Sequence, residues 1–259
     1  MLYVEPISAF DDNYIWLLRE SGRVGVAVVD PGDADPVIAR LHDRGLDLTA
    51  ILITHHHQDH IGGVADLLAH WPGALVTAPQ DRRIASATRV VGEGDSISVP
   101  GFETRFDVIE VPGHTSTHIA YLADGALFCG DTLFAAGCGR VFDGTFEQLA
   151  ASLRRISALP PQTLCYCAHE YTLANLGFAA WVEPDSAALA ERTAQARRQR
   201  DAGEPTVPFE LMLELATNPF LRTAEPAVIS AAEGFAGERL VDQTTVFSAL
   251  RRWKDQRYD

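Results

Sequence analysis

The most constraining feature of this sequence is a run of apolar residues, Ala50 to Ile53, that leads directly into the segment THHHQDH at positions 54–60. A short apolar run of this kind is typical of a buried strand, and residues 61–70 predict a helix after it. Four of the nine histidines of the chain lie within this one segment. The sequence therefore predicts a strand, a loop and a helix, with a dense set of polar side chains where the strand ends.

The spacing of these side chains favours metal binding over a solvated loop. In an extended segment, residues two apart project to the same side, so His55 and His57 can present their imidazoles together while His56 points away. As the chain turns into the helix, Asp59 and His60 diverge and can face a second point nearby. One segment can therefore supply ligands to two ions. The competing interpretation is local hydrogen bonding, with Asp59 as a helix cap.

Three further donors stand at predicted strand ends or turns: His114 in PGHT, Asp131 in GDT and His169 in AHEYT. Taken singly, His114 or His169 is explained more simply as a structural residue. Together with the cluster at 55–60, they form a set of nitrogen and carboxylate donors without thiolates. Such a set suits zinc, iron or manganese in a catalytic site better than a closed structural zinc site.

The charge balance excludes several classes of partner. The chain carries 35 acidic and 21 basic residues, a net charge of −14, which argues against nucleic acid or an anionic membrane as a partner. The N-terminus shows no basic region followed by an apolar run, and no stretch approaches the roughly 18 apolar residues of a membrane span. We therefore expect a cytoplasmic protein. In that reducing compartment, the four cysteines are expected to be buried free thiols.

The order of predicted elements indicates a layered α/β fold followed by a helical tail. Strands are predicted at residues 2–7, 14–18, 24–30, 50–53, 74–78, 102–111, 119–122, 126–129 and 163–167, and helices at 36–45, 61–70 and 146–159. After Tyr171 the sequence predicts helices only. One starts at 184–186 and closes at Gly203, one is capped by Thr206 and reaches about Ala216, and one covers 244–256.

The motifs together resemble a known family. The segment THHHQDH, with PGHT, GDT and HEYT downstream, is similar to the metallo-β-lactamase superfamily. The stretches GDTLFAAGCGR, HEYT and NPFLR narrow the resemblance to its glyoxalase II (hydroxyacylglutathione hydrolase) family, and the similarity runs from DNYIWLL near the start to RRWKDQR near the end. The resemblance implies an αββα sandwich with a C-terminal helical domain. Residues 1–172 would form the metal-binding catalytic domain and 173–259 the substrate-binding domain.

The resemblance also implies a ligand set that spacing alone does not assign. It places His55, His57 and His114 on one ion, and Asp59, His60 and His169 on the other. Asp131 would bridge the two. The implied cofactors are two divalent metal ions, with zinc first and iron or manganese as alternatives.

A reaction follows from such a pair. Two ions roughly 3.5 to 4 Å apart can share a water, lower its pKa toward neutrality and polarise a carbonyl oxygen. The resemblance implies attack of metal-bound hydroxide on the thioester carbonyl of S-D-lactoylglutathione, which gives glutathione and D-lactate in the second step of methylglyoxal detoxification. A protein nucleophile is not needed. Asp59 is the expected catalytic residue, because it would orient the hydroxide as well as bind metal.

The anionic substrate needs a basic patch, and the C-terminus supplies one. Residues 251–259 have a net charge of +2. The resemblance places Arg251 and Lys254 on the glycine carboxylate, and Arg140 and Tyr171 on the cysteinyl-glycine portion. Phe142 stands where the family often has a tyrosine, so one hydroxyl contact is lost. The competing interpretation of Arg251 and Lys254 is a solvated helix end that complements the helix dipole.

Other functions fit parts of the pattern. A persulfide dioxygenase with one iron, a lactonase or β-lactamase, and a metal-dependent sensor with an idle site are the alternatives. The first would lack most of the second-site ligands, yet His60, Asp131 and His169 are all present. A glutathione thioester is the expected partner, and we expect a monomer. His118 is a candidate for contact with a metal ligand.

Overall fold

The computed structural model describes residues 1–258, and the chain divides into two compact units. The first comprises Met1–Glu110 and Thr117–Gly130, and the second comprises Val111–Ser116 and the chain from Asp131 onward. The sequence predicts a different division, with a catalytic domain that ends at residue 172 and a substrate-binding domain that begins at residue 173. That division by function stays a prediction.

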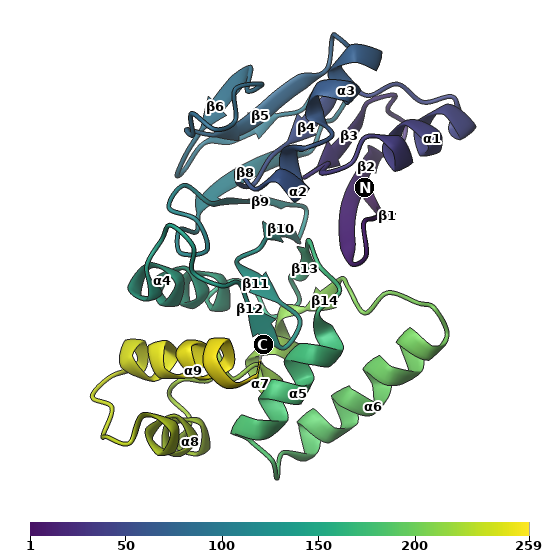
Figure 1. Ribbon diagram of the computed structural model, residues 1–259. Coiled ribbons are helices and arrows are strands. Elements are labelled where there is room, and N and C mark those ends of the chain that lie inside the picture. Colours follow the sequence, from purple (N-terminus) through teal and green to yellow (C-terminus); the bar gives the residue numbers. More distant parts are fainter. Residues whose placement is uncertain (259) are drawn as a thin grey trace. The chain divides into compact units, whose positions relative to one another are not determined.

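The first unit contains a six-stranded sheet in the order β1-β2-β3-β4-β5-β6 (Figure 1). Its strands are β1 (Leu2–Ala9), β2 (Asn13–Glu20), β3 (Val26–Val29), β4 (Ala50–Leu52), β5 (Leu75–Pro79) and β6 (Arg89–Val91). Strands β1 to β3 are antiparallel, whereas β3 to β6 run parallel, with Ile51 opposite Val28 on one side and Val76 on the other. The carboxyl ends of β3 and β4 therefore meet at one edge of the sheet, where Asp30 and the histidine segment begin.

Helices cover one face of this sheet. Helix α1 (Asp35–Arg44) has proline in its first turn and ends at Gly45 in a left-handed conformation, as the sequence predicts. Helix α3 (Val64–His70) follows the histidine segment. Val37, Leu41, Val64 and Leu67 of these helices share one buried cluster with the inward side chains of β1 to β5. Burial of this apolar surface holds the sheet edge in place under the loops that carry the polar residues.

A second sheet in the first unit carries antiparallel strands. They are β7 (Ser96–Ser98), β8 (Arg105–Glu110), β9 (Ile119–Ala123) and β10 (Ala126–Gly130). Tyr121 of β9 is fully buried, and its hydroxyl lies 2.9 Å from the carbonyl oxygen of Ile53 and 3.1 Å from that of Thr77. This contact ties β9 to the carboxyl ends of β4 and β5.

The second unit is mainly helical. Its helices are α4 (Phe146–Ser157), α5 (Thr172–Val182), α6 (Ala187–Asp201), α7 (Leu211–Thr217), α8 (Pro226–Ala236) and α9 (Gln243–Arg257). Strands β11 (Leu133–Phe134) and β12 (Gly137–Cys138) form a hairpin, and β13 (Leu164–Cys167) pairs with β14 (Phe209–Glu210). Capping boxes at Thr145 and Asp242 start α4 and α9. The sequence did not predict α5 or α8.

The predicted helix from Thr206 to about Ala216 is wrong at its start. Helix α7 begins at Leu211, because residues 209 and 210 pair with β13 instead. Thr206 is not a helix cap. Its backbone N–H donates to Glu170 Oε2 at 2.8 Å, and its hydroxyl donates to the same carboxylate. Strand pairing and this buried carboxylate therefore override the local helix signal.

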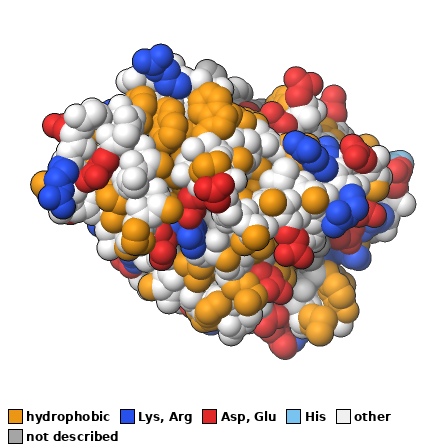
Figure 2. Space-filling model, turned by 90° about the horizontal axis from the view of Figure 1, so that it is seen from below, with side chains coloured by type: hydrophobic (Ala, Val, Ile, Leu, Met, Phe, Trp, Pro, Cys, Tyr) orange, Lys and Arg blue, Asp and Glu red, His pale blue; other side chains and the backbone are white. Residues whose placement is uncertain are grey.

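The expectation for the cysteines is met. All four cysteines are free and buried. None of the helices within residues 1–258 is long and apolar enough to cross a membrane. On the face drawn in Figure 2, acidic and basic side chains are interspersed among apolar ones.

Candidate metal centre

The histidine segment forms the loop between β4 and a short helix, α2 (Gln58–Ile61). His57 is the N-cap residue of α2 and keeps an extended backbone. His55 and His57 therefore precede the helix, whereas Asp59 and His60 lie within it. His55 and His60 are fully buried. The chain therefore places two of the predicted donors before the helix and two within it.

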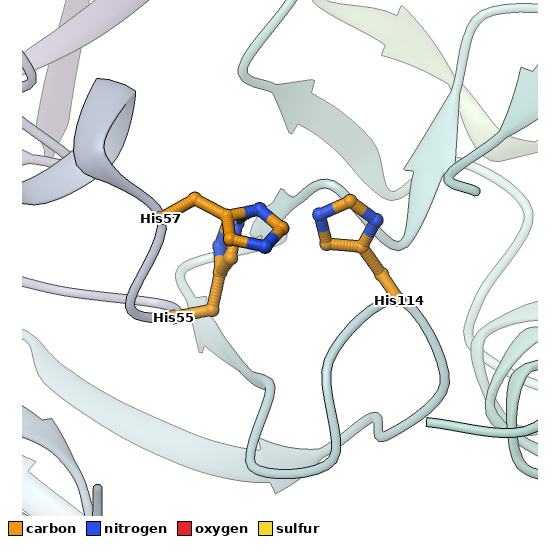
Figure 3. A group of neighbouring side chains, drawn as sticks. All are labelled: His55, His57 and His114. Atoms are coloured by element: carbon orange, nitrogen blue, oxygen red, sulfur yellow. Dashed lines mark hydrogen bonds between the residues drawn. The ribbon is translucent and has the colours of Figure 1, made fainter. Parts of the chain in front are cut away.

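The first pair has its ring nitrogens face to face. Nε2 of His55 lies 3.1 Å from Nδ1 of His57, and the rings meet edge-on with centroids 4.7 Å apart (Figure 3). Two nitrogens bound to one zinc at about 2.0–2.1 Å in a tetrahedral site stand about 3.3 Å apart. His56 faces elsewhere, with Nδ1 3.5 Å from the Asp81 carboxylate. The first pair therefore has the spacing of two ligands on one ion.

The second pair has a similar spacing. Asp59 Oδ2 lies 3.4 Å from Nε2 of His60. The side-chain amide of Asn13 donates to the same Asp59 oxygen at 3.2 Å, and Nδ1 of His60 lies 3.0 Å from the buried carboxylate of Asp30. These contacts leave Nε2 of His60 directed toward Asp59.

The second unit brings three donors together. Asp131 Oδ2 lies 3.5 Å from Nε2 of His114 and 3.4 Å from Nε2 of His169. All three residues are buried. Nδ1 of His114, the third ring drawn in Figure 3, lies 2.7 Å from the carbonyl oxygen of Arg140, so its Nε2 is the nitrogen that faces Asp131. One carboxylate oxygen thus stands between two histidines.

These distances provide a test of fit for metal. Direct charge-assisted hydrogen bonds between nitrogen and carboxylate are typically about 2.7–2.9 Å long. The three histidine–carboxylate pairs span 3.4–3.5 Å instead, close to the separation of two ligands on one ion. Imidazole and carboxylate are also the donors that zinc, iron and manganese accept. The residues therefore fit divalent metal ions.

Backbone packing sets the position of Asp59. A Cβ atom at Gly32 would collide with the backbone of Asp59, and one at Gly63 would lie 2.5 Å from the backbone nitrogen of Ala34. The loop after β3 and helix α2 therefore touch through their main chains. Only glycine at these two positions allows that approach.

A cavity of about 400 Å³ lies in the second unit. All five residues predicted to bind substrate line it, together with donor His114; the full lining is His114, Phe134, Cys138, Arg140, Phe142, Tyr171, Ala174, Asn175, Arg251 and Lys254. Phe142 is 64% exposed and packs edge-on against His114, with ring centroids 5.2 Å apart. The cavity and the donor set thus share a residue.

The two predicted carboxylate-binding residues are buried in the cavity wall. Arg251 is 1% exposed and Lys254 is 6% exposed. The guanidinium of Arg251 donates to the carbonyl of Cys138 at 3.0 Å and to Asp255 at 2.8 Å. The ammonium of Lys254 lies 5.7 Å from the ring centroid of Tyr258. These residues are therefore not a solvated helix end.

Sequence reasoning missed the residues that hold the β11–β12 hairpin. The amide of Asn175 donates to the carbonyl of Ala135 at 3.0 Å, and that of Asn218 donates to Gly137 at 2.9 Å. Glu214 is fully buried and accepts the N–H of Ala136 at 2.8 Å. Ala136 has a φ of 56°, unusual for a residue with a side chain. Of the three side chains that hold the hairpin, only that of Asn218, in NPFLR, belongs to a motif that the sequence analysis noted.

Comparisons with known proteins identify the family of this chain. Residues 9–169 match the family model of the metallo-beta-lactamase superfamily, and residues 170–257 match that of the hydroxyacylglutathione hydrolase C-terminus. A hydroxyacylglutathione hydrolase from Alkalilimnicola ehrlichii is 55% identical, over 99% of this chain and 100% of the relative. One from Xanthomonas axonopodis pv. citri is 50% identical, over 96% and 97%. The chain belongs to the hydroxyacylglutathione hydrolase family.

Solved structures confirm the fold that this family membership implies. The BLEG-1 B3 metallo-beta-lactamase aligns with a TM-score of 0.63 at 22% identity, over 85% of this chain and 99% of that one. A di-iron-bound form of TTHA1623 aligns with a TM-score of 0.53 at 29% identity, over 64% and 91%. The αββα metallo-β-lactamase fold with a C-terminal helical region, predicted from the sequence, is therefore that of this hydroxyacylglutathione hydrolase family member.

Proposed function

We propose that this chain is a thioester hydrolase that converts S-2-hydroxyacylglutathiones, S-D-lactoylglutathione foremost, to glutathione and the free hydroxy acid. One observation carries the proposal: His114 belongs both to the metal-donor set and to the wall of the cavity that contains the predicted glutathione-binding residues. A substrate in this cavity would lie beside a metal ligand. The names of the relatives support the same reaction.

The proposed ligands follow the pairs described above. His55, His57 and His114 would hold one ion, Asp59, His60 and His169 the other, and Asp131 would stand between the two. When bound, two such ions polarise a carbonyl oxygen and make hydroxide available at neutral pH. Zinc is the metal that we propose, because nitrogen-rich four-coordinate sites suit it, although iron and manganese accept the same donors.

The remaining chemistry belongs to the chain. The carbonyl of Arg140 holds His114 by its Nδ1, and the Asn13 amide holds the carboxylate of Asp59, which we propose orients the attacking hydroxide. Cys138 lines the cavity, but burial raises the pKa of its thiol to about 11, so it stays protonated at neutral pH. A covalent acyl-enzyme on this thiol is therefore not part of the mechanism.

The cavity walls suggest how glutathione is held. The cavity has a volume of about 400 Å³, which suits a ligand of modest size. We propose that Arg251 and Lys254 attract the glycine carboxylate, while Arg140 and Tyr171 contact the cysteinyl-glycine portion. Phe142 supplies ring surface where a hydroxyl contact is absent.

The remaining proposals concern context. We propose a monomeric cytoplasmic enzyme that acts on a small molecule and has neither nucleic acid nor membrane as a partner. The net charge of −14 supports the exclusion of nucleic acid and of anionic membranes. We also propose that residues 1–172 carry the metal centre and 173–259 complete the substrate site. A persulfide dioxygenase or a lactonase is not favoured, because the donors of the second ion and the glutathione-binding tail are complete.

Metal analysis coupled to hydrolysis of S-D-lactoylglutathione tests the proposal. We expect about two ions per chain and turnover that falls at least about 100-fold in Asp131→Ala, because loss of the central carboxylate weakens both sites. The matched control is His70→Ala, since His70 is an exposed histidine on α3. Full activity with a single ion, unchanged by added metal, would disprove the two-ion mechanism. A chain that holds two ions but leaves glutathione thioesters intact would disprove the proposed substrate.

A further inference from the structure

The buried carboxylate of Asp30 stands behind the histidine segment and takes no part in the proposed ligand set. Asp30 follows β3 directly and has a φ of 52°. A residue with a side chain adopts this left-handed conformation at a cost, and such positions concentrate at functional sites. This backbone conformation therefore raises the question of which groups the Asp30 carboxylate contacts.

The carboxylate has three donors around it. Its Oδ1 accepts the backbone N–H of Thr54 at 2.8 Å. Its Oδ2 accepts the hydroxyl of Thr54 at 2.7 Å and lies 3.0 Å from Nδ1 of His60. Because an ionised carboxylate only accepts hydrogen bonds, Nδ1 of His60 must carry the proton. Nε2 of His60 is then the nitrogen with a lone pair, and it is the one that faces Asp59.

The same carboxylate reaches His55 through Thr54. The Thr54 hydroxyl oxygen lies 3.0 Å from Nδ1 of His55. A hydroxyl has one hydrogen, and here it is donated to Asp30, so its oxygen accepts from Nδ1–H of His55. His55 therefore has the same tautomer as His60, with Nε2 directed at His57.

We propose that Asp30 is a positioning residue for both metal sites at once. It fixes the ring of His60 directly and the ring of His55 through Thr54, and these are ligands of different ions in the proposed function, on which this inference rests. The two ions are then coupled through one carboxylate of the chain. Loss of the Asp30 carboxylate therefore lowers the affinity of the chain for both ions, whereas loss of the Thr54 hydroxyl lowers the affinity only for the ion on His55.

The lengths of its contacts support a positioning role over direct ligation by Asp30. Donor atoms of Asp30, His55 and His60 lie within 4.8 Å of one another, so an ion on Asp30 is the alternative. The 2.7–3.0 Å contacts of Asp30 are, however, hydrogen-bond lengths, shorter than the 3.4 Å between Asp59 and His60. His118 also stacks on His55, with centroids 4.5 Å apart, so that ring is held from its face as well.

The experiment measures zinc affinity by chelator competition, and the visible spectrum of the cobalt-substituted protein, in four variants. In Asp30→Asn, an amide N–H group replaces an acceptor opposite His60 or Thr54, so we expect both ions to bind about 10- to 100-fold more weakly. In Thr54→Val, we expect weaker binding of the ion on His55 only, and a change in the visible spectrum of cobalt at that site only. Thr54→Ser restores the hydroxyl and should match the wild type, as should the control Asp33→Asn.

The outcomes separate the possibilities. Equal affinities for both ions in wild type and Asp30→Asn would overturn the proposal, as would equal losses at both ions in Thr54→Val. If Asp30→Asn fails to fold, Thr54→Val and Thr54→Ser still test the proposal. A loss of affinity for one ion in Thr54→Val, with none in Thr54→Ser, would support it, and equal affinities in the two variants would overturn it. A wild-type protein that binds no zinc or cobalt would instead overturn the proposed metal centre itself.

Discussion

Three histidines of the site, His55, His60 and His114, are each held by a contact to the ring nitrogen that faces away from the donor partner. The partner of Nδ1 is the Thr54 hydroxyl for His55, a carboxylate for His60 and a main-chain carbonyl for His114. Such contacts fix ring orientation and raise the basicity of the opposite nitrogen. The precision of the site therefore depends on residues that are not donors themselves.

Replacement of Lys254 by alanine tests the remote end of the cavity. A charge contact far from the reacting carbonyl contributes mainly to binding, so Lys254→Ala should raise KM for S-D-lactoylglutathione about tenfold with a smaller effect on kcat. Because Lys254 is buried in the cavity wall, salt screens the contact only in part, so the difference from wild type should shrink modestly at high ionic strength. Steady-state kinetics at two salt concentrations measures both effects.

The control for this prediction is Arg252→Ala, because Arg252 lies on the same helix, is exposed and is absent from the cavity wall. A small neutral thioester without glutathione should be hydrolysed equally by wild type and Lys254→Ala. An equal loss on both substrates would mean that Lys254 supports the fold rather than the substrate.

At the scale of elements, the hairpin β11–β12 depends on helices that follow it in sequence. Glu214 of α7 accepts the N–H of Ala136 in the hairpin turn, and Arg192 of α6 forms an ion pair with the same carboxylate. Both charged residues are buried. The hairpin contributes Phe134 and Cys138 to the cavity, so α6 and α7 shape a binding wall that they do not line.

Removal of Glu214 should therefore affect both stability and binding. Glu214→Ala leaves Arg192 buried without its carboxylate, and we expect a loss of about 3–5 kcal/mol in the free energy of unfolding. Urea unfolding followed by circular dichroism measures this loss. Glu191→Ala, an exposed position on α6, is the control and should change stability by less than about 0.5 kcal/mol. A stability loss as small as the control's would contradict a structural role for the pair.

The elements differ in how far the sequence could predict them. Helix α1 was predictable because its proline, apolar spacing and terminal glycine agree. Helix α5 was not, because apolar residues occur on all its sides and give no amphipathic signal. The start of α7 was misplaced because pairing of Phe209 with Cys165 is a tertiary contact that local propensity does not report.

At the scale of the whole molecule, the proposed metal ligands come from both units. The first unit carries His55, His57, Asp59 and His60, and the second carries His114, Asp131 and His169. The sequence could predict the pairs within 55–60, because strand and helix geometry act over a few residues. It could not assign the distant donors to particular ions, because that depends on long-range packing.

If the proposed ligands bind metal only in the folded chain, metal should stabilise the protein. Because a ligand that binds only the folded state stabilises it, metal at 100 times its Kd should add about 2.7 kcal/mol. Treatment with a chelator should lower Tm in a thermal melt, and added zinc should restore it. Magnesium is the control, since it prefers oxygen ligands and should restore little. An unchanged Tm after complete metal removal would show that the folded chain binds the ion no more tightly than the unfolded chain does, which would contradict the proposed metal centre.

The direct contact between the main chains at Gly32 and Asp59 also bears on which substitutions the molecule tolerates. A methyl group at position 32 would push the backbone of Asp59 aside, and its carboxylate with it, although every histidine and carboxylate of the donor set would still be present in the sequence. A survey of random variants should therefore find inactive proteins with an intact donor set, altered only at a glycine. Sequence comparison restricted to the donor residues would score such proteins as functional, so Gly32 and Gly63 belong among the positions that identify an active family member.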